Sequence, residues 1–271
     1  MIPQIENSIH IQLLKKIRYI VIAAGLLFFN SNISFGQSRL SLVVGSGSLR
    51  FQNFHSSNIS GGILTPDYLH SPGCSIRASY SHGNDKRVHH LLLGVNNYTS
   101  FKLSGPVNTI TKPGNSQMNI WGMYQFEHKL FDPLFHFLRL DPGGTFFLEN
   151  ARRNQLYNPD YKRSRNRLLA GALFTVHAHF QPTDLFDVHM QLGNGGFVGK
   201  DRFHQDINQI NKTKSIVGWI SNFDTSLNFP IHRKISLMLD FYWDQYLIYG
   251  SDTPEKLRSY NLSAGISYQW R

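Results

Sequence analysis

Long segments in which apolar and polar residues alternate are the feature that most constrains the fold of this chain. In residues 258–270 the even positions include Tyr260, Leu262, Ile266 and Trp270, whereas the odd positions carry serine, asparagine, glycine and glutamine. Successive side chains of a β-strand point to opposite faces, so a period of two is typical of a strand. The segment therefore predicts a strand with one apolar and one polar face.

The same alternation recurs along the chain. It is clear in residues 76–80, 90–103, 167–180, 186–192, 217–229 and 235–249, and less regular in residues 39–45, 119–129 and 134–149. In the last of these, Asp141-Pro142-Gly143-Gly144 interrupts the pattern and predicts a bulge or a turn. Together the segments give about ten antiparallel strands, with eight or twelve as alternatives if that break or the first loop is assigned differently.

Strand length and loop length separate a membrane barrel from a soluble sandwich, which also alternates. Several segments run to roughly 10–15 residues, longer than the five or six of an average strand and suited to a tilted membrane strand. The connections alternate between short (82–87, 131–133, 181–183, 230–233) and longer (47–73, 104–117, 150–166, 194–214, 250–256). Outer-membrane barrels place short turns in the periplasm and long loops outside. We therefore predict an all-β, closed antiparallel transmembrane barrel.

Aromatic residues mark two levels of the predicted apolar face. Tyr260 and Trp270 lie ten positions apart on one segment, and Trp219 and Phe229 lie ten positions apart on another. Ten steps of about 3.3 Å on a tilted strand rise about 25 Å, the height of the apolar band between the aromatic girdles of such barrels. Charged residues are only 16% of the chain, which also favours a surface that faces lipid.

The N-terminal residues have the order of a secretory signal. Lys15, Lys16 and Arg18 precede an apolar run over residues 19–29, and a polar stretch leads to Gln37. This order predicts a cleaved signal peptide over residues 1–36 and a barrel over residues 37–271, with a buried core helix as the alternative for the apolar run. Export makes nucleic acid an unexpected partner for the net charge of +10. Cys74 is a single cysteine, so no intramolecular disulfide is expected.

The C-terminal segment Ile266-Ser267-Tyr268-Gln269-Trp270-Arg271 resembles the C-terminal signal of outer-membrane β-barrel proteins. In that signal, alternating apolar residues lead to a terminal aromatic residue. Here Arg271 follows Trp270, which departs from the usual terminal phenylalanine. The resemblance is to the class, with no particular subfamily, and it implies location in the outer membrane and recognition by the barrel-assembly machinery.

The predicted inward face carries charged and histidine side chains. A barrel of about ten strands is too narrow for an open porin channel, so these groups are expected to fill it and to neutralise one another. We therefore expect a non-enzymatic role in envelope structure, surface interaction or limited passage of small solutes, with a ligand pocket at the mouth as an alternative. The predicted network comprises Arg77, His90, Lys102, Glu127, Arg167, His177, His179, Asp187, His189, Asp240 and Asp244.

The stretch His55-Ser56-Ser57-Asn58 resembles the catalytic stretch of outer-membrane phospholipase A and of lipid A deacylases. The resemblance implies a lipid hydrolase in which His55 is the base and Ser57 the nucleophile. The stretch lies in a predicted loop near the start of the chain, whereas in those families it lies on a later strand. A lipid hydrolase is therefore the alternative function.

Two further patterns of the inward face are weaker. Asp187-Val188-His189 is similar in spacing to a site of the omptin proteases, which lies at the extracellular rim, but here the pair follows a short turn and is expected at the periplasmic end. His177 and His179 give only two metal ligands, with no evident third. No metal and no cofactor is therefore predicted.

Basic residues gather in the predicted long loop 150–166. If this loop lies outside the cell, its side chains are expected to contact the phosphates of lipopolysaccharide. An ordinary solvated loop is the alternative. The candidates are Arg152, Arg153, Lys162, Arg163 and Arg165.

Overall fold

The computed structural model describes residues 37–53, 68–84, 86–99, 102–104, 109–111, 116–129, 137–158, 161–183, 185–205, 210–250 and 254–270. These residues form twelve strands, whose bounds are β1 Gln37–Asn53, β2 Tyr68–Gly83, β3 Arg87–Thr99, β4 Lys102–Ser104, β5 Thr109–Thr111, β6 Ser116–His128, β7 Leu138–Asn158, β8 Tyr161–Thr183, β9 Phe186–Gln205, β10 Ile210–His232, β11 Ile235–Tyr249 and β12 Glu255–Trp270. In this part of the chain, no helix is long and apolar enough to cross a bilayer. The predicted signal peptide, residues 1–36, lies outside the described residues.

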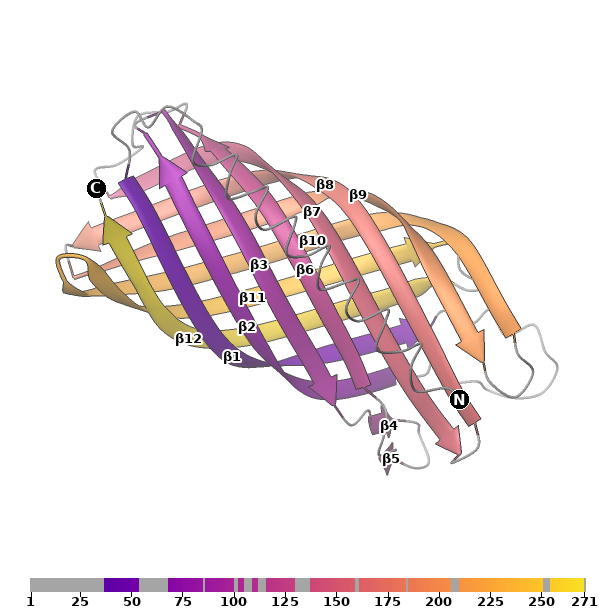
Figure 1. The fold of residues 1–271 in the computed structure, drawn as a ribbon. Coiled ribbons are helices and arrows are strands. Elements are labelled where there is room, and N and C mark those ends of the chain that lie inside the picture. Colours follow the sequence, from indigo (N-terminus) through magenta and orange to yellow (C-terminus); the bar gives the residue numbers. More distant parts are fainter. Residues whose placement is uncertain are drawn as a thin grey trace, which may run out of the picture. The chain divides into compact units, whose positions relative to one another are not determined.

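Ten of the strands close into an antiparallel barrel, which confirms the predicted fold class. The ring runs β1-β12-β11-β10-β9-β8-β7-β6-β3-β2 and closes because β1 also pairs with β2. Ser38 of β1 is in register with Trp270 of β12 on one side and with His82 of β2 on the other. The short strands β4 and β5 form a hairpin that continues from the first residues of β2. Figure 1 shows the tilted strands of the ring, with β4 and β5 at one end.

The two ends of the barrel differ. One end carries the first residue of β1, the last residue of β12 and the turns that join β2 to β3, β6 to β7, β8 to β9 and β10 to β11. We call this the turn end and the opposite end the loop end. Short turns face the periplasm in outer-membrane barrels, so the turn end is expected on the periplasmic side.

Two of the predicted long loops are wrong in extent. Most of residues 150–166 and 194–214 belong to strands, because β7 runs to Asn158, β8 begins at Tyr161, β9 runs to Gln205 and β10 begins at Ile210. Polar side chains occupy both faces of these strand ends. For example, Arg153 is buried and Arg152 is exposed, so apolar and polar residues no longer alternate in the sequence. Backbone pairing continues without it. The first predicted loop, 47–73, is likewise shortened by the ends of β1 and β2.

The segment Asp141-Pro142-Gly143-Gly144 is neither a bulge nor a turn. It lies within β7, and Asp141 and Gly143 stay in register with His177 and Thr175 of β8. The pairing of β7 with β6 ends at Gly143, so Pro142 pairs on one side only, where a missing N–H is tolerated. A Cβ atom on Gly143 would clash with the carbonyl oxygen of Phe126, so the close approach of the backbones requires glycine there.

The outer surface of the barrel is apolar, as predicted. On β1 the exposed side chains include Leu40, Leu42 and Val44, while Ser41 and Val43 between them are buried. So large an exposed apolar surface fits a protein that contacts hydrocarbon rather than water.

The enclosed face is less uniformly polar than predicted. It carries aromatic and aliphatic side chains in addition to polar ones, among them Trp121, Phe147, Phe197, Tyr242 and Tyr246. The rings of Trp121 on β6 and Tyr242 on β11 stack at a centroid distance of 6.0 Å, although these strands lie on opposite sides of the ring. Because some inward positions are apolar, the alternation of apolar and polar residues in the sequence is incomplete on these strands.

Candidate functional site

A buried carboxylate surrounded by histidines lies inside the barrel near the turn end. Glu127, the last residue but one of β6, is 1% exposed. Four histidines from three other strands approach it: His90 from β3, His177 and His179 from β8, and His189 from β9. We call these five residues the histidine cluster.

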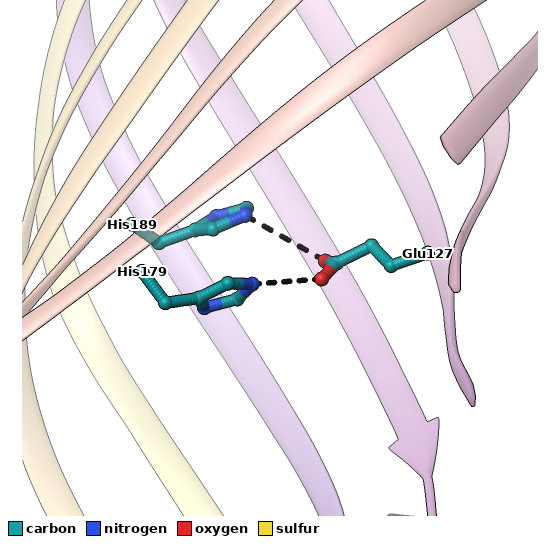
Figure 2. A group of neighbouring side chains, drawn as sticks. All are labelled: Glu127, His179 and His189. Atoms are coloured by element: carbon teal, nitrogen blue, oxygen red, sulfur yellow. Dashed lines mark hydrogen bonds and ion pairs between the residues drawn. The ribbon is translucent and has the colours of Figure 1, made fainter. Parts of the chain in front are cut away.

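Both carboxylate oxygens of Glu127 receive a short hydrogen bond from an imidazole. Nε2 of His90 lies 2.6 Å from Oε1, and Nε2 of His179 lies 2.7 Å from Oε2. Figure 2 shows His179 and His189 pointing at the Glu127 carboxylate from one side. The carboxylate therefore forms the centre of the cluster.

His177 and His189 complete the inner part of the cluster. Nδ1 of His177 lies 3.3 Å from Oε1 of Glu127 and 3.2 Å from Nε2 of His189, which is itself 3.6 Å from the same Oε1. The His189 ring also stacks on His179 with a centroid distance of 4.6 Å. Three ligand-type atoms thus form a compact triangle.

Polar side chains contact three of the four histidines of the cluster. Oγ1 of Thr175 lies 2.9 Å from Nε2 of His177, and Oγ of Ser81 lies 2.7 Å from Nδ1 of His90. Asp141 accepts a hydrogen bond from Nε of Arg139 at 2.5 Å and lies 3.8 Å from Nε2 of His179. His177 and His90 are therefore each held by a second hydrogen-bonding partner.

Three residues of the cluster offer ligand atoms close enough together to hold a metal ion. Glu127, His179 and His189 each offer a ligand atom, and these atoms lie within 4.8 Å of one another. Imidazole nitrogen and carboxylate oxygen are ligands that zinc and its neighbours in the first transition row accept. From the sequence, only His177 and His179 were recognised as possible metal ligands, because the other ligands come from β6 and β9. The signal that could have found them is that all five residues are inward positions close to a predicted short turn.

Arginine and carboxylate side chains meet deeper in the barrel. Arg77 of β2 donates to Oδ2 of Asp224 on β10 at 2.9 Å and also pairs with Asp240 on β11. These strands are not neighbours of β2, so the ion pairs cross the lumen. Asp244, also buried, accepts a hydrogen bond from Oγ of Ser259 at 2.7 Å.

A second arginine and carboxylate group lies toward the loop end. Arg165 and Arg167 of β8 both pair with Asp201 of β9 and with Glu255 of β12. Since β8 and β12 are separated by three strands, this group also crosses the lumen. We call the pairs of Arg77 and this second group, together, the arginine pairs.

The remaining predicted site residues are dispersed. Asp187 accepts a hydrogen bond from Nδ2 of Asn228 at 2.6 Å, while His189 contacts the histidine cluster, so the two do not form a common site. Arg153 is buried and Arg165 is engaged inside the barrel, so neither is placed to contact outer lipid, whereas Arg152 is exposed. The side chains of Lys102, Lys162 and Arg163, and the whole of the His55 and Ser57 stretch, lie outside the described part.

Comparison with known proteins identifies the fold. No protein-family model matches the chain, and no curated protein sequence matches it. Among solved structures, the chain is similar to the outer membrane protease OmpT from Escherichia coli, with a TM-score of 0.63 and 8% identity over 89% of this chain and 99% of that one. It is also similar to the translocator domain of the autotransporter NalP from Neisseria meningitidis, with a TM-score of 0.50 and 10% identity over 97% of each chain.

Identities this low establish a shared fold and carry no function across. The match agrees with the closed ten-strand ring and with the apolar side chains on its outer surface. The chain therefore has the fold of outer-membrane β-barrel proteins.

Proposed function

We propose that this protein is a non-enzymatic outer-membrane barrel whose lumen is closed by its own side chains, and that it contributes to envelope structure and surface contact. The observation that carries the proposal is that interactions cross the lumen between strands that are not neighbours. Arg77 of β2 reaches β10 and β11, and Arg167 of β8 reaches β12.

A tyrosine–carboxylate hydrogen bond and an aromatic stack add to these crossings. Oη of Tyr246 on β11 donates to Oε2 of Glu149 on β7 at 2.6 Å, and Trp121 stacks on Tyr242 across the barrel. A buried charge that loses its partner is strongly unfavourable. Opening a continuous water path therefore requires several such contacts to separate together.

Conductance across a planar bilayer tests the closed lumen. The full barrel, refolded and reconstituted, is expected to give no stable single-channel steps. Replacing Arg77, Arg165 and Arg167 together by Ala removes the cations of the arginine pairs and is expected to produce conducting events. Lys200→Ala, a change at an exposed position of β9, serves as the control and is expected to stay silent. Large, regular steps from the unchanged protein would refute a closed lumen.

Contact with lipopolysaccharide is part of the proposed surface role. Arg152 of β7 and Arg202 of β9 are both exposed, and both are in register with Asn166 of β8. The two guanidinium groups thus lie in one row across three strands toward the loop end, where lipid phosphates are expected. Replacing both by Gln is expected to weaken binding of the folded barrel to lipid A micelles, whereas Arg153→Gln, a change at a buried position, is not. Equal loss in both variants would contradict the proposal.

A further inference from the structure

We propose that the histidine cluster binds one divalent ion of the late first transition row, with zinc as its redox-inert representative, through Glu127, His177, His179 and His189. The inference goes beyond a closed envelope barrel and does not depend on it. It rests on the arrangement of the ligand atoms, on the residues behind them and on the access of water to the cluster.

The ligand atoms already have the spacing of a tetrahedral site. Zinc lies about 2.0–2.1 Å from its nitrogen and oxygen ligands, so two ligands of a tetrahedron are roughly 3.3–3.4 Å apart. The triangle of Glu127 Oε1, His177 Nδ1 and His189 Nε2 has edges of 3.3, 3.2 and 3.6 Å. These three atoms thus form one face of such a tetrahedron.

His179, which contacts the other carboxylate oxygen of Glu127, is the proposed fourth ligand. Its Nε2 lies 2.7 Å from Oε2 of Glu127, and its ligand atom, that of Glu127 and that of His189 lie within 4.8 Å of one another. It follows His177 by two positions on β8, so both rings are on the inward face. Three imidazoles and one carboxylate are a donor set that favours zinc, copper or nickel over magnesium or calcium, which prefer oxygen ligands.

The ring of His177 is held in the way that imidazole ligands are held in known metal centres. In such sites the imidazole nitrogen that does not bind the metal is held by a hydrogen-bonding partner. Thr175 lies at Nε2 of His177, which leaves Nδ1 for the metal. His90 bonds to Glu127 with one nitrogen and to Ser81 with the other, so it positions the carboxylate.

Without a metal, the facing nitrogens of His177 and His189 need a shared proton. They lie 3.2 Å apart, and a neutral imidazole has one donor and one acceptor nitrogen. A metal ion between them removes this requirement and brings positive charge to a buried carboxylate. The His179 and His189 side chains are 31% and 24% exposed, so an ion can reach them from the turn end.

A Co²⁺ and Zn²⁺ titration of the full, folded barrel tests the proposal. Protein stripped with a chelator is expected to bind one Co²⁺ per chain, with the strong visible absorption of a four-coordinate site, and to release it to Zn²⁺ but not to Mg²⁺. His189→Ala removes a proposed ligand and is expected to weaken binding at least as much as the loss of an outer-shell partner does, about 10–100-fold. The matched control His204→Ala changes another histidine of β9, which is exposed and bonds to Asn211, and is expected to bind as the unchanged protein does.

Two outcomes overturn the proposal: no saturable Co²⁺ binding to the unchanged barrel, or equal binding by the His189→Ala and His204→Ala variants. Folding of each variant is checked by its circular dichroism and by its resistance to unfolding in detergent. If His189→Ala does not fold, His179→Asn provides the second variant, because His179 is the more exposed of the two side chains. Conductance does not enter these outcomes, so failure here leaves the closed lumen standing.

Discussion

The histidine cluster and the arginine pairs solve the same problem of burying charge in different ways. In the arginine pairs, Arg77 sits between two carboxylates, Asp224 and Asp240, and its guanidinium charge is permanent. In the histidine cluster, a single carboxylate is surrounded by imidazoles, which can be neutral. We infer that the arginine pairs act as fixed crosslinks between strands. The histidine cluster, in contrast, has side chains suited to binding a ligand.

The largest expected effect is at Arg77. Replacing it by Ala leaves the buried Asp240 and the partly exposed Asp224 without their cation, which is expected to lower the free energy of unfolding by about 3–5 kcal/mol. Urea unfolding of the barrel in lipid vesicles measures the change. The control Lys200→Ala alters an exposed residue and is expected to change stability by less than about 0.5 kcal/mol. A cost at Arg77 no larger than that of the control would show that these pairs are not crosslinks.

Glu127→Gln is expected to have a smaller effect in metal-free protein. The amide retains the shape and one acceptor oxygen but loses the charge that His90 and His179 donate to, so the expected cost is about 1–3 kcal/mol. The same change is expected to abolish the stabilisation that excess Zn²⁺ gives to the unchanged barrel, about 2.7 kcal/mol at 100 times Kd. Thermal or urea unfolding with and without Zn²⁺ reports both. Stabilisation by Zn²⁺ that survives in the variant would place the ion elsewhere.

The smallest effect is expected at Arg167. Arg165 also contacts Asp201 and Glu255, so removing Arg167 leaves neither carboxylate without a cation. We expect Arg167→Ala to cost about 1–2 kcal/mol, and the double change with Arg165→Ala to cost more than the sum of the single changes. A double-mutant cycle under the same unfolding conditions measures the coupling. Strict additivity would mean that the two arginines act independently.

Much of the fold was predictable from the sequence because the face of each strand that contacts lipid must carry apolar residues. The alternation around Leu42, Leu262 and Ile266 predicted both the strands and the face that lies outward. The extended ends of β7 to β10 were missed because polar residues lie on both faces where no hydrocarbon constrains them. The site was predicted only in part, since the meeting of Glu127 with His189 depends on how strands three places apart in the ring are staggered.

The central claim is that alternate residues of each strand contact hydrocarbon and the enclosed lumen. Spin labels at positions 42 and 43 of β1, introduced one at a time as Leu42→Cys and Val43→Cys in a Cys74→Ser background, test it most directly in lipid vesicles. The label at position 42 is expected to collide with oxygen dissolved in the bilayer and to be shielded from a water-soluble nickel chelate. The label at position 43 is expected to be shielded from both, because Leu42 is 50% exposed and Val43 only 2%. Equal collision with oxygen at the two positions, or the reverse order, would show that these residues do not alternate between hydrocarbon and the lumen.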